Sequence, residues 1–154
     1  MITFGELAAH LERQAVAVEA EIAGLVRATA ESGAEMAREM IGREQETVAV
    51  PTGYFARWAP LAVRTIDDKT KLGFGPPDYQ PLLRSGQYRA SISGTSIGLT
   101  GVVGSSDPVG VYHEFGTAEM PPRPVLGRAV AVSFEVLCDQ LGRVAMRALK
   151  PPGA

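Results

Sequence analysis

The sequence predicts an α+β fold in which long helices at both ends flank a small central antiparallel sheet with short helices. Apolar residues recur at alternating intervals of three and four from Phe4 to Val26, which is typical of one buried face of a helix. The same spacing returns from Leu126 to Ala148. Between them, residues 91–104 are rich in Ser, Thr, Ile, Val and Gly, a composition that favours short strands.

The size and composition of the chain indicate one domain with its own core. It has 154 residues, of which 45% are hydrophobic. We expect a single domain, 1–154, built from an N-terminal helix (1–43), a central α/β region (44–125) with a flexible loop near 73–80, and an amphipathic C-terminal helix (126–149). The formal net charge is −2 and the basic residues are scattered, which disfavours nucleic-acid binding driven by bulk charge. No apolar run is long enough to cross a bilayer and no secretion signal is visible, so we expect a soluble protein without a membrane partner.

The N-terminal helix begins with a recognisable cap. Thr3 and Glu6 have the spacing of a capping box, and Gly42 is a suitable C-terminal stop. A helix of roughly forty residues would be about 60 Å long, more than a small core can cover. Either part of its apolar stripe packs on another subunit, or the helix breaks near Gly33.

The central region is expected to hold several short elements. Proline and glycine mark their boundaries, because proline suits the first turn of a helix and glycine suits its end. The expected elements are a strand at 47–50, a helix at 62–72 with Pro60 at its start and Gly73 as its stop, a mobile loop at 73–78, a helix at 82–90, two strands turning near Gly98, one or two helical turns at 109–115, and an extended segment at 121–124.

The single cysteine limits the redox chemistry of the chain. Cys138 has no partner for an internal disulfide or a cysteine-based zinc site, which fits a reducing cytoplasmic origin. It lies within the apolar pattern of the C-terminal helix, so we expect a small buried side chain rather than a reactive thiol.

A histidine beside an acid makes residues 111–127 the most informative stretch. It is either an active-site loop around His113 and Glu114 or a rigid loop that positions one subunit against another. Adjacent residues point in different directions, and the other histidine, His10, has no ligand partner at a metal-binding spacing. A His113 base acting on Ser105 or Ser106 is geometrically permitted, but no pattern selects it. We therefore predict no catalytic residue, metal or cofactor, with a small hydrolase using His113 and Glu114 as a weaker alternative.

Other polar and aromatic residues around this stretch have structural interpretations. Tyr112 and Phe115 are three residues apart and share a face if the segment is helical, so we expect them to pack in the core or at an interface. Four arginines are expected to pair with glutamates within the chain or between subunits: Arg84, Arg89, Arg123 and Arg128.

Three motifs occur in a fixed order: the first contains Trp58, Pro60 and Leu61, the second contains Leu83, Arg84 and Gly86, and the third runs from Tyr112 to Pro124. In this order they resemble the tailed-phage virion morphogenesis family, the tail-completion or neck proteins of siphophages and Mu-like phages. That family has a leucine-arginine-x-glycine-x-leucine-arginine helix, a His-Glu-Phe-Gly segment and a Pro-x-Arg-Pro-Phe-Leu turn before its C-terminal helix. The matching residues, within a span of about 58–129, are Trp58, Pro60, Leu61, Leu83, Arg84, Gly86, Tyr112, His113, Glu114, Phe115, Gly116, Met120, Pro121, Pro122, Arg123 and Pro124. Tyr88 and Val125 depart from the family pattern, both by apolar exchanges.

The resemblance implies a structural virion protein of the head–tail junction, without enzymatic turnover. By this analogy the chain is made in the host bacterial cytoplasm and forms a homo-oligomeric ring, sixfold rather than twelvefold, through which DNA passes without specific binding. Its other partners would be phage neck and tail proteins: the connector or stopper, and the tail terminator or tail tube. A further alternative is a non-phage dimeric adaptor that pairs through the N-terminal helix.

The resemblance also leads to a hypothesis about the proline-rich turn. The segment from Tyr112 to Leu126 would be a pre-shaped contact with another subunit or neck protein. In that contact Arg123 would make a charged bond, and residues 120–124 would give the shape.

Overall fold

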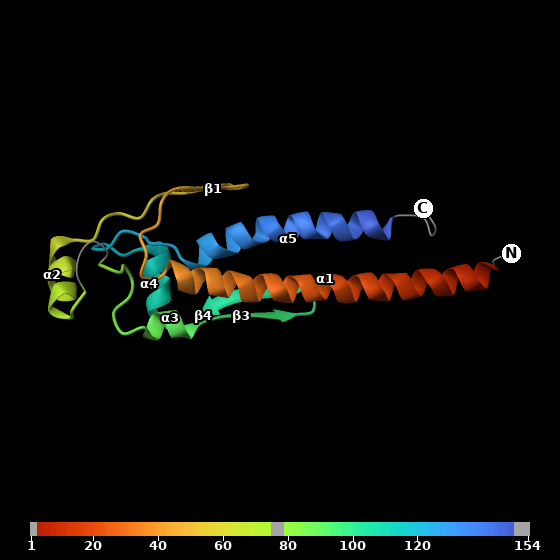
Figure 1. Ribbon diagram of the computed structural model, residues 1–154, viewed down its shortest axis with the longest axis horizontal. Coiled ribbons are helices and arrows are strands. Elements are labelled where there is room, and N and C mark those ends of the chain that lie inside the picture. The colour runs from red at the N-terminus through yellow and green to blue at the C-terminus, as the bar shows by residue number, and fades with distance from the viewer. Residues whose placement is uncertain (1–2, 75–78, 150–154) are drawn as a thin grey trace.

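The computed structural model describes residues 3–74 and 79–149 of the chain. In the described residues, α1 and α5 lie side by side along the long axis, and α2, α3 and α4 gather at the end opposite the two chain ends (Figure 1). The predicted α+β class is confirmed, although the strands form two separate two-stranded sheets rather than one. The elements are α1 (Phe4–Met40), β1 (Val48–Val50), β2 (Gly53–Phe55), α2 (Val63–Lys71), α3 (Gln87–Ser91), β3 (Ile92–Ile97), β4 (Thr100–Ser105), α4 (Val109–Phe115) and α5 (Leu126–Ala148).

Helix α1 is continuous over 37 residues, about 56 Å. The predicted capping box is confirmed: the Thr3 hydroxyl accepts from the Glu6 amide at 3.2 Å, and the Glu6 carboxylate accepts from the Thr3 amide at 2.8 Å. The predicted alternative of a break near Gly33 is wrong. Gly33 is buried where α1 meets two other elements, and a Cβ there would lie 3.2 Å from Ser133 Oγ and 3.3 Å from Val103 Cγ2. Its missing side chain therefore makes room for α5 and β4.

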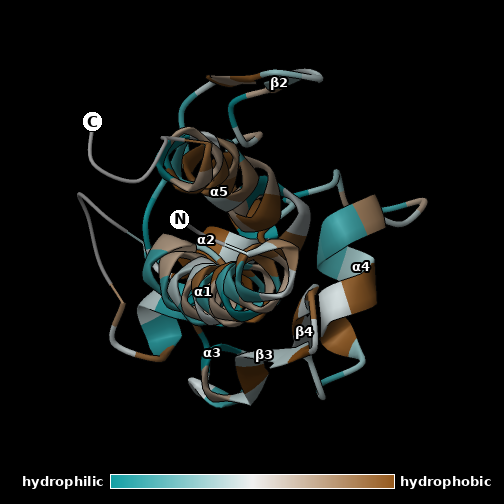
Figure 2. Ribbon diagram, turned by 90° about the vertical axis from the view of Figure 1, so that its right-hand side faces the viewer, coloured by the Kyte–Doolittle hydropathy of each residue, from teal (hydrophilic) through white to brown (hydrophobic). Residues whose placement is uncertain are grey.

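The β3–β4 hairpin packs directly on the backbone of α1. Its strands are antiparallel, with Ile97 opposite Thr100, and the turn contains Gly98 at φ +57°, as predicted. A Cβ at Gly94 would lie 2.0 Å from the carbonyl oxygen of Ala30, so only glycine fits where β3 crosses α1. Figure 2, seen nearly along α1, shows α5 on one side of this helix and the hairpin on the other.

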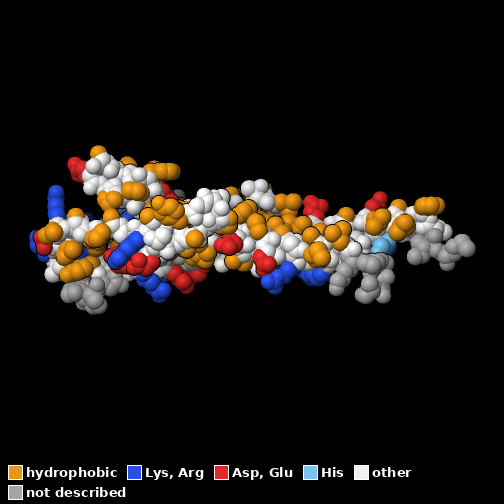
Figure 3. Space-filling model, turned by 90° about the horizontal axis from the view of Figure 1, so that it is seen from above, with side chains coloured by type: hydrophobic (Ala, Val, Ile, Leu, Met, Phe, Trp, Pro, Cys, Tyr) orange, Lys and Arg blue, Asp and Glu red, His pale blue; other side chains and the backbone are white. Residues whose placement is uncertain are grey.

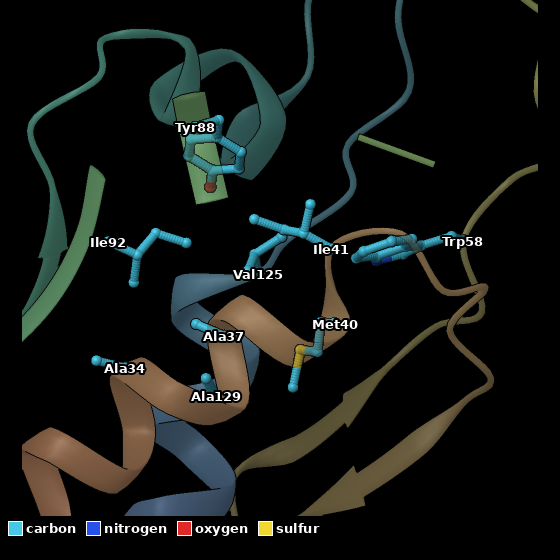
Figure 4. Packing of buried hydrophobic residues seen from close by; sticks show 9 residues of the cluster. All are labelled: Ala34, Ala37, Met40, Ile41, Trp58, Tyr88, Ile92, Val125 and Ala129. Atoms are coloured by element: carbon cyan, nitrogen blue, oxygen red, sulfur yellow. The ribbon is translucent and has the colours of Figure 1, made fainter. Parts of the chain in front are cut away.

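Helix α5 runs antiparallel to α1 and closes the core. Val144 of α5 is buried, and near its end Arg147 forms an ion pair with Glu21 of α1 at 2.5 Å. The main hydrophobic cluster lies at the other end of this pair, where α1, α3, β3 and the start of α5 meet (Figure 4). Its buried residues are Ala34, Ala37, Met40, Ile41, Trp58, Tyr88, Ile92, Val125 and Ala129.

Two predicted helices begin later than expected. The helix predicted over 82–90 is wrong in its first half, because α3 begins only at Gln87. Leu82 and Gly86 have φ values of 64° and 82°, which a right-handed helix cannot include. Helix α2 begins at Val63, so Pro60 precedes it instead of forming its first turn.

The β1–β2 hairpin was only half predicted. The strand expected at 47–50 corresponds to β1, whereas β2 was missed because three residues are too few to show an alternating pattern. The hairpin extends alongside α5 at a distance from the other elements (Figure 1). Arg128, a buried residue of α5, donates to the carbonyl oxygen of Glu46 just before β1 and so joins the two.

Three further expectations have different outcomes. Cys138 is exposed, which corrects the prediction of a buried side chain: it lies about 100° around the helix from Leu137, the residue that faces a groove. Residues 75–78 of the predicted mobile loop lie outside the described part of the chain. Among the described residues, no helix has the length and apolar character needed to cross a membrane.

The first turns of α1 extend beyond the end of α5 (Figure 1). We call this stretch, Phe4–Ala17, the arm. Its apolar side chains are largely uncovered: Phe4 is 93% exposed, Leu11 55% and Leu7 44%. The first buried residue of α1 is Val26, so the predicted stripe is covered only in the second part of the helix.

Candidate functional site

The three sequence motifs converge on one cleft at the end of the molecule where α2, α3 and α4 gather. The cleft has a volume of about 760 Å³. Pro60 and Leu61 line it from the first motif, Arg84 from the second and His113 from the third. Ten of the sixteen motif residues line this cleft: Pro60, Leu61, Leu83, Arg84, Gly86, Tyr112, His113, Met120, Pro121 and Arg123.

The first motif connects the cleft wall to the core. Trp58 is 2% exposed and packs in the hydrophobic cluster (Figure 4), while its amide donates to the carbonyl oxygen of Gln45 at 3.0 Å. Two residues later the chain emerges at Pro60 and Leu61, which line the cleft. The buried indole therefore fixes where this wall stands.

A buried lysine holds the second motif. Lys69 of α2 is 6% exposed, and its ammonium group donates to the carbonyl oxygens of Gln80 at 2.8 Å and Leu83 at 2.5 Å. It also lies 4.7 Å from the centre of the Phe74 ring, a cation–π distance. These bonds keep the segment before α3 in a loop, which is why the helix predicted there does not form.

The acid of the third motif caps a helix. Glu114 Oε1 accepts from the amides of Val125 at 2.7 Å and Leu126 at 2.5 Å, and Oε2 accepts from the amide of Gly127 at 3.1 Å. Val125, the residue before α5, supplies no side-chain cap of its own. A carboxylate at this position satisfies unpaired amides and interacts favourably with the helix dipole. Both Glu114 oxygens are thus occupied by backbone amides.

The glycine of the third motif permits a tight return of the chain. Gly116 has φ +72°, and a Cβ there would lie 2.7 Å from the carbonyl oxygen of Met120 and 2.9 Å from the nitrogen of Pro122. Across the turn, the Thr117 amide donates to the Met120 carbonyl oxygen at 2.8 Å. The loop therefore folds against its own start, and any residue other than glycine at 116 would be strained.

Arg123 joins this loop to the first motif. Its amide donates to the carbonyl oxygen of His113 at 2.7 Å, and its guanidinium group donates to the carbonyl oxygens of Ala59 at 3.0 Å and Pro60 at 3.2 Å. The residue is 6% exposed, and this burial lowers the pKa of the guanidinium, against the opposing influence of Glu44. Its position does not fit the expected charged bond to another subunit, because its side chain is already enclosed and bonded within the chain.

The arginines were expected to pair with glutamates, and this is wrong for the two that are buried. Arg123 and Arg128 donate to backbone carbonyl oxygens. Arg84 forms an ion pair at 3.3 Å, but with Asp68, and both side chains are largely exposed. Buried guanidinium groups here connect distant segments of backbone.

His113 packs against Tyr88 at the cleft. The two ring centres are 5.3 Å apart and tilted by 50°. Burial lowers the pKa of His113 below its usual 6.5, and Arg123 lowers it further, while Asp107 and Glu114 act in the opposite direction. Burial also raises the pKa of Tyr88 to about 12, so both rings are neutral at pH 7. Among the described residues, neither His113 Nδ1 nor the Tyr88 hydroxyl has a hydrogen-bond partner.

The structure does not bring together the side chains on which the catalytic alternatives depend. The Ser105 hydroxyl bonds to the Ser91 hydroxyl at 2.6 Å and to the backbone of Asp107, and no hydrogen bond joins it to His113 in the described chain. His113 and Glu114 diverge as predicted, one toward Tyr88 and the other toward α5. Within residues 3–74 and 79–149, no group of three potential metal ligands lies together.

Two aromatic residues of the third motif are exposed at the surface of α4. Tyr112 is 55% exposed and Phe115 81%. Core packing, one of the two roles expected for them, is therefore excluded, and an interface role remains a prediction. Exposed large aromatic side chains are typical of protein–protein contacts.

Two residues that shape the site were not singled out from the sequence. Lys69 is not among the motif residues named from the sequence, and its burial against the loop at 80–83 has no local sequence signal. Asp107 accepts from the amide of Val109 at 3.0 Å and so supports the start of α4. An aspartate just before Pro108 is a recognisable helix-capping signal, from which this role of Asp107 can be predicted.

Comparisons with known proteins identify no relative. No protein-family model, no curated protein and no solved structure matches the chain.

Proposed function

We propose that this chain is a structural virion protein of the phage head–tail junction, which forms a ring around the DNA channel and joins the tail to the head. The observation that carries the proposal is that charged side chains of the third motif bond to backbone groups of their own chain. Glu114 and Arg123 bind backbone groups within the chain and fix the shape of the cleft. A motif whose charged groups bond to the backbone in this way favours a shaped contact surface over a reactive centre.

The exposed aromatic residues support the same proposal. Tyr112 and Phe115 belong to a motif whose neighbours are tightly held, yet both project into solvent. A rigid base that carries exposed aromatic side chains loses little conformational entropy on binding. We therefore assign the contact with a neck or tail protein, or with a neighbouring subunit, to this face of α4.

The proposal is tested with a phage that encodes this chain. Deleting the gene should give DNA-filled heads and separate tails in electron micrographs, and supplying the wild-type chain should restore infectious particles. Mass spectrometry of purified virions should detect the chain. Normal infectious yield without the gene, or its absence from virions, would contradict the proposal.

A matched pair of variants tests the face of α4. Replacing both Tyr112 and Phe115 by Ala should lower infectious yield about tenfold or more while the purified chain remains folded, because exposed side chains contribute little to monomer stability. Tyr54→Ala is the control, since Tyr54 is also an exposed aromatic residue, 72%, but lies on β2. Equal yields for the two variants would exclude the face of α4 as the contact.

A dimeric adaptor is the second candidate, and the arm is the observation that favours it. The exposed stripe of Phe4, Leu7 and Leu11 has the spacing of a helix-pairing surface. This candidate predicts a stable two-copy protein in solution and no copy in virions. Measuring the mass of the purified chain and analysing virions therefore separates the two candidates.

A further inference from the structure

The arm carries an apolar stripe that remains largely exposed. Phe4, Leu7 and Leu11 follow one another at intervals of three and four, and between 44% and 93% of each is exposed. At 100° per residue they lie on one side of the helix. The charged residues of the arm lie outside this line: Glu6, Glu12 and Arg13.

The stripe continues the face of α1 that α5 covers. Phe4, Leu11, Val18, Ile22 and Gly33 fall within about 60° of the helix circumference. Gly33 is the residue against which Ser133 of α5 packs. In Figure 3, seen from above, hydrophobic side chains continue from this pair of helices along the projecting end of the molecule. The apolar face of α1 thus continues past the level of Ala148, the last residue of α5.

An apolar groove lies on the same molecule, between α1, α5 and the β3–β4 hairpin. Its volume is about 300 Å³. Val26 and Ala30 of α1 form its floor, and Leu99, Val130 and Phe134 line it while remaining 42% to 58% exposed. None of the described residues that line it is charged.

We propose that the arm of one copy of this chain docks in the apolar groove of a second copy. The arm cannot reach the groove of its own chain. Val26 and Ala30 of the same helix line that groove, and α1 is continuous from Ala17 to Val26, so it cannot fold back on itself. An uncharged stripe in an uncharged groove removes no charge from water. The motif cleft, in contrast, is lined by exposed charged groups such as Asp68 and Arg84, which an apolar helix would desolvate.

A covering partner would stabilise the arm. Most helical stability in proteins comes from packing of an amphipathic face, and the arm is the part of α1 whose apolar face remains largely exposed. Docking in a groove would bury the side of the arm that α5 leaves open. Residue types and geometry therefore agree on a helix-in-groove contact.

The contact joins two different surfaces, so it is heterologous and leads to a ring when its rotation closes. The inference thus deepens the proposed function by naming how neighbouring subunits meet, and its ring interpretation rests on that function. The contact itself can be tested without phage.

The test uses two single-surface variants of the purified full chain. The arm variant carries Leu7→Gln and Leu11→Gln, and the groove variant carries Val130→Gln and Phe134→Gln. Analytical ultracentrifugation should show oligomers for the wild type, while each variant should need about tenfold or more higher concentration to assemble. Val16→Gln is the control, because Val16 is 68% exposed on the opposite side of the arm and should assemble as the wild type does.

Mixing the variants identifies the kind of contact. Each variant keeps one intact surface, so an equal mixture should form dimers but no larger species. A groove variant that assembles normally would show that the arm pairs with another arm, and the proposal would be wrong. A wild-type chain that stays monomeric at its highest soluble concentration would also overturn it, provided that circular dichroism shows it folded.

The two proposals can fail separately. A chain that assembles through this contact but is absent from virions overturns the proposed function alone. A virion protein whose arm variant still assembles and restores infectivity overturns the contact alone.

Discussion

The cleft end of the molecule and the arm at the opposite end differ in what their side chains contact. At the cleft, Lys69, Glu114 and Arg123 bind backbone groups from segments far away in the sequence. In the arm, Leu7 and Leu11 are 44% and 55% exposed. At one end charged side chains bond to backbone groups of the same chain, and the other end presents an exposed apolar face.

The difference between the two ends indicates which surface can supply the free energy of association between copies of the chain. A surface whose polar groups are already bonded has a fixed shape and offers complementarity, while an exposed apolar stripe gains free energy when it is covered. The two ends therefore suit different contacts. We assign partner recognition to the exposed face of α4 beside the cleft and subunit association to the arm.

The largest expected effect contrasts two glycines. Gly94→Ala should destabilise the protein by roughly 3 kcal/mol or more, because its Cβ would lie 2.0 Å from the carbonyl oxygen of Ala30 and β3 must move away from α1. Gly24→Ala, in α1 between the arm and Val26, should instead stabilise α1 by about 0.5–1 kcal/mol, because nothing outside the local helix backbone lies within 4 Å of its Cβ. Urea unfolding of both variants measures the contrast. Similar stabilities would mean that the hairpin does not rest on α1.

A smaller effect is expected from removing a glutamate. Glu114→Ala should cost about 2–3 kcal/mol, because three amides at the start of α5 lose their acceptor. Glu12→Ala in the arm is the control and should change stability by less than about 0.5 kcal/mol, since Glu12 is exposed and alanine favours a helix. If the two variants unfold at the same urea concentration, Glu114 does not cap α5.

The smallest effect concerns pH and contrasts the two histidines. Burial lowers the pKa of His113 from 6.5, so the unfolded chain binds the proton more readily than the folded one. The stability that neutral His113 contributes is present above pH 6.5 and is lost as the pH falls through the lowered pKa. His113→Gln should therefore reduce the loss of stability on acidification, measured by urea unfolding above and below pH 6.5. His10→Gln, in the arm, is the matched control, and an equal change in both variants would contradict the assignment to His113.

Local sequence signals predicted most of the helices and the main hairpin. The stripes of α1 and α5, the capping box at Thr3 and the turn at Gly98 all depend on neighbouring residues, and each is confirmed. The failures have a shared cause. The loop at 82–86 and the separate β1–β2 hairpin depend on partners far away in the chain, such as Lys69 for the loop and Arg128 for the hairpin.

The sequence predicted which residues belong to the candidate site, but not what each of them does there. The motif residues were all named from the sequence, and ten of them line the cleft. The sequence alone did not reveal that Glu114 caps α5 or that Arg123 is buried, because both bonds join segments more than ten residues apart. An interface role fits only those motif residues that remain exposed, above all Tyr112 and Phe115.

The sequence by itself determined the α+β class, the two amphipathic helices and the set of motif residues. Periodicity and capping are local, so the chain encodes them within a few turns of each residue. Only the tertiary structure decided which part of the long stripe is buried and which residues of the motifs are enclosed. Burial depends on where α5 ends and how the loops return, and these are set by contacts between distant segments.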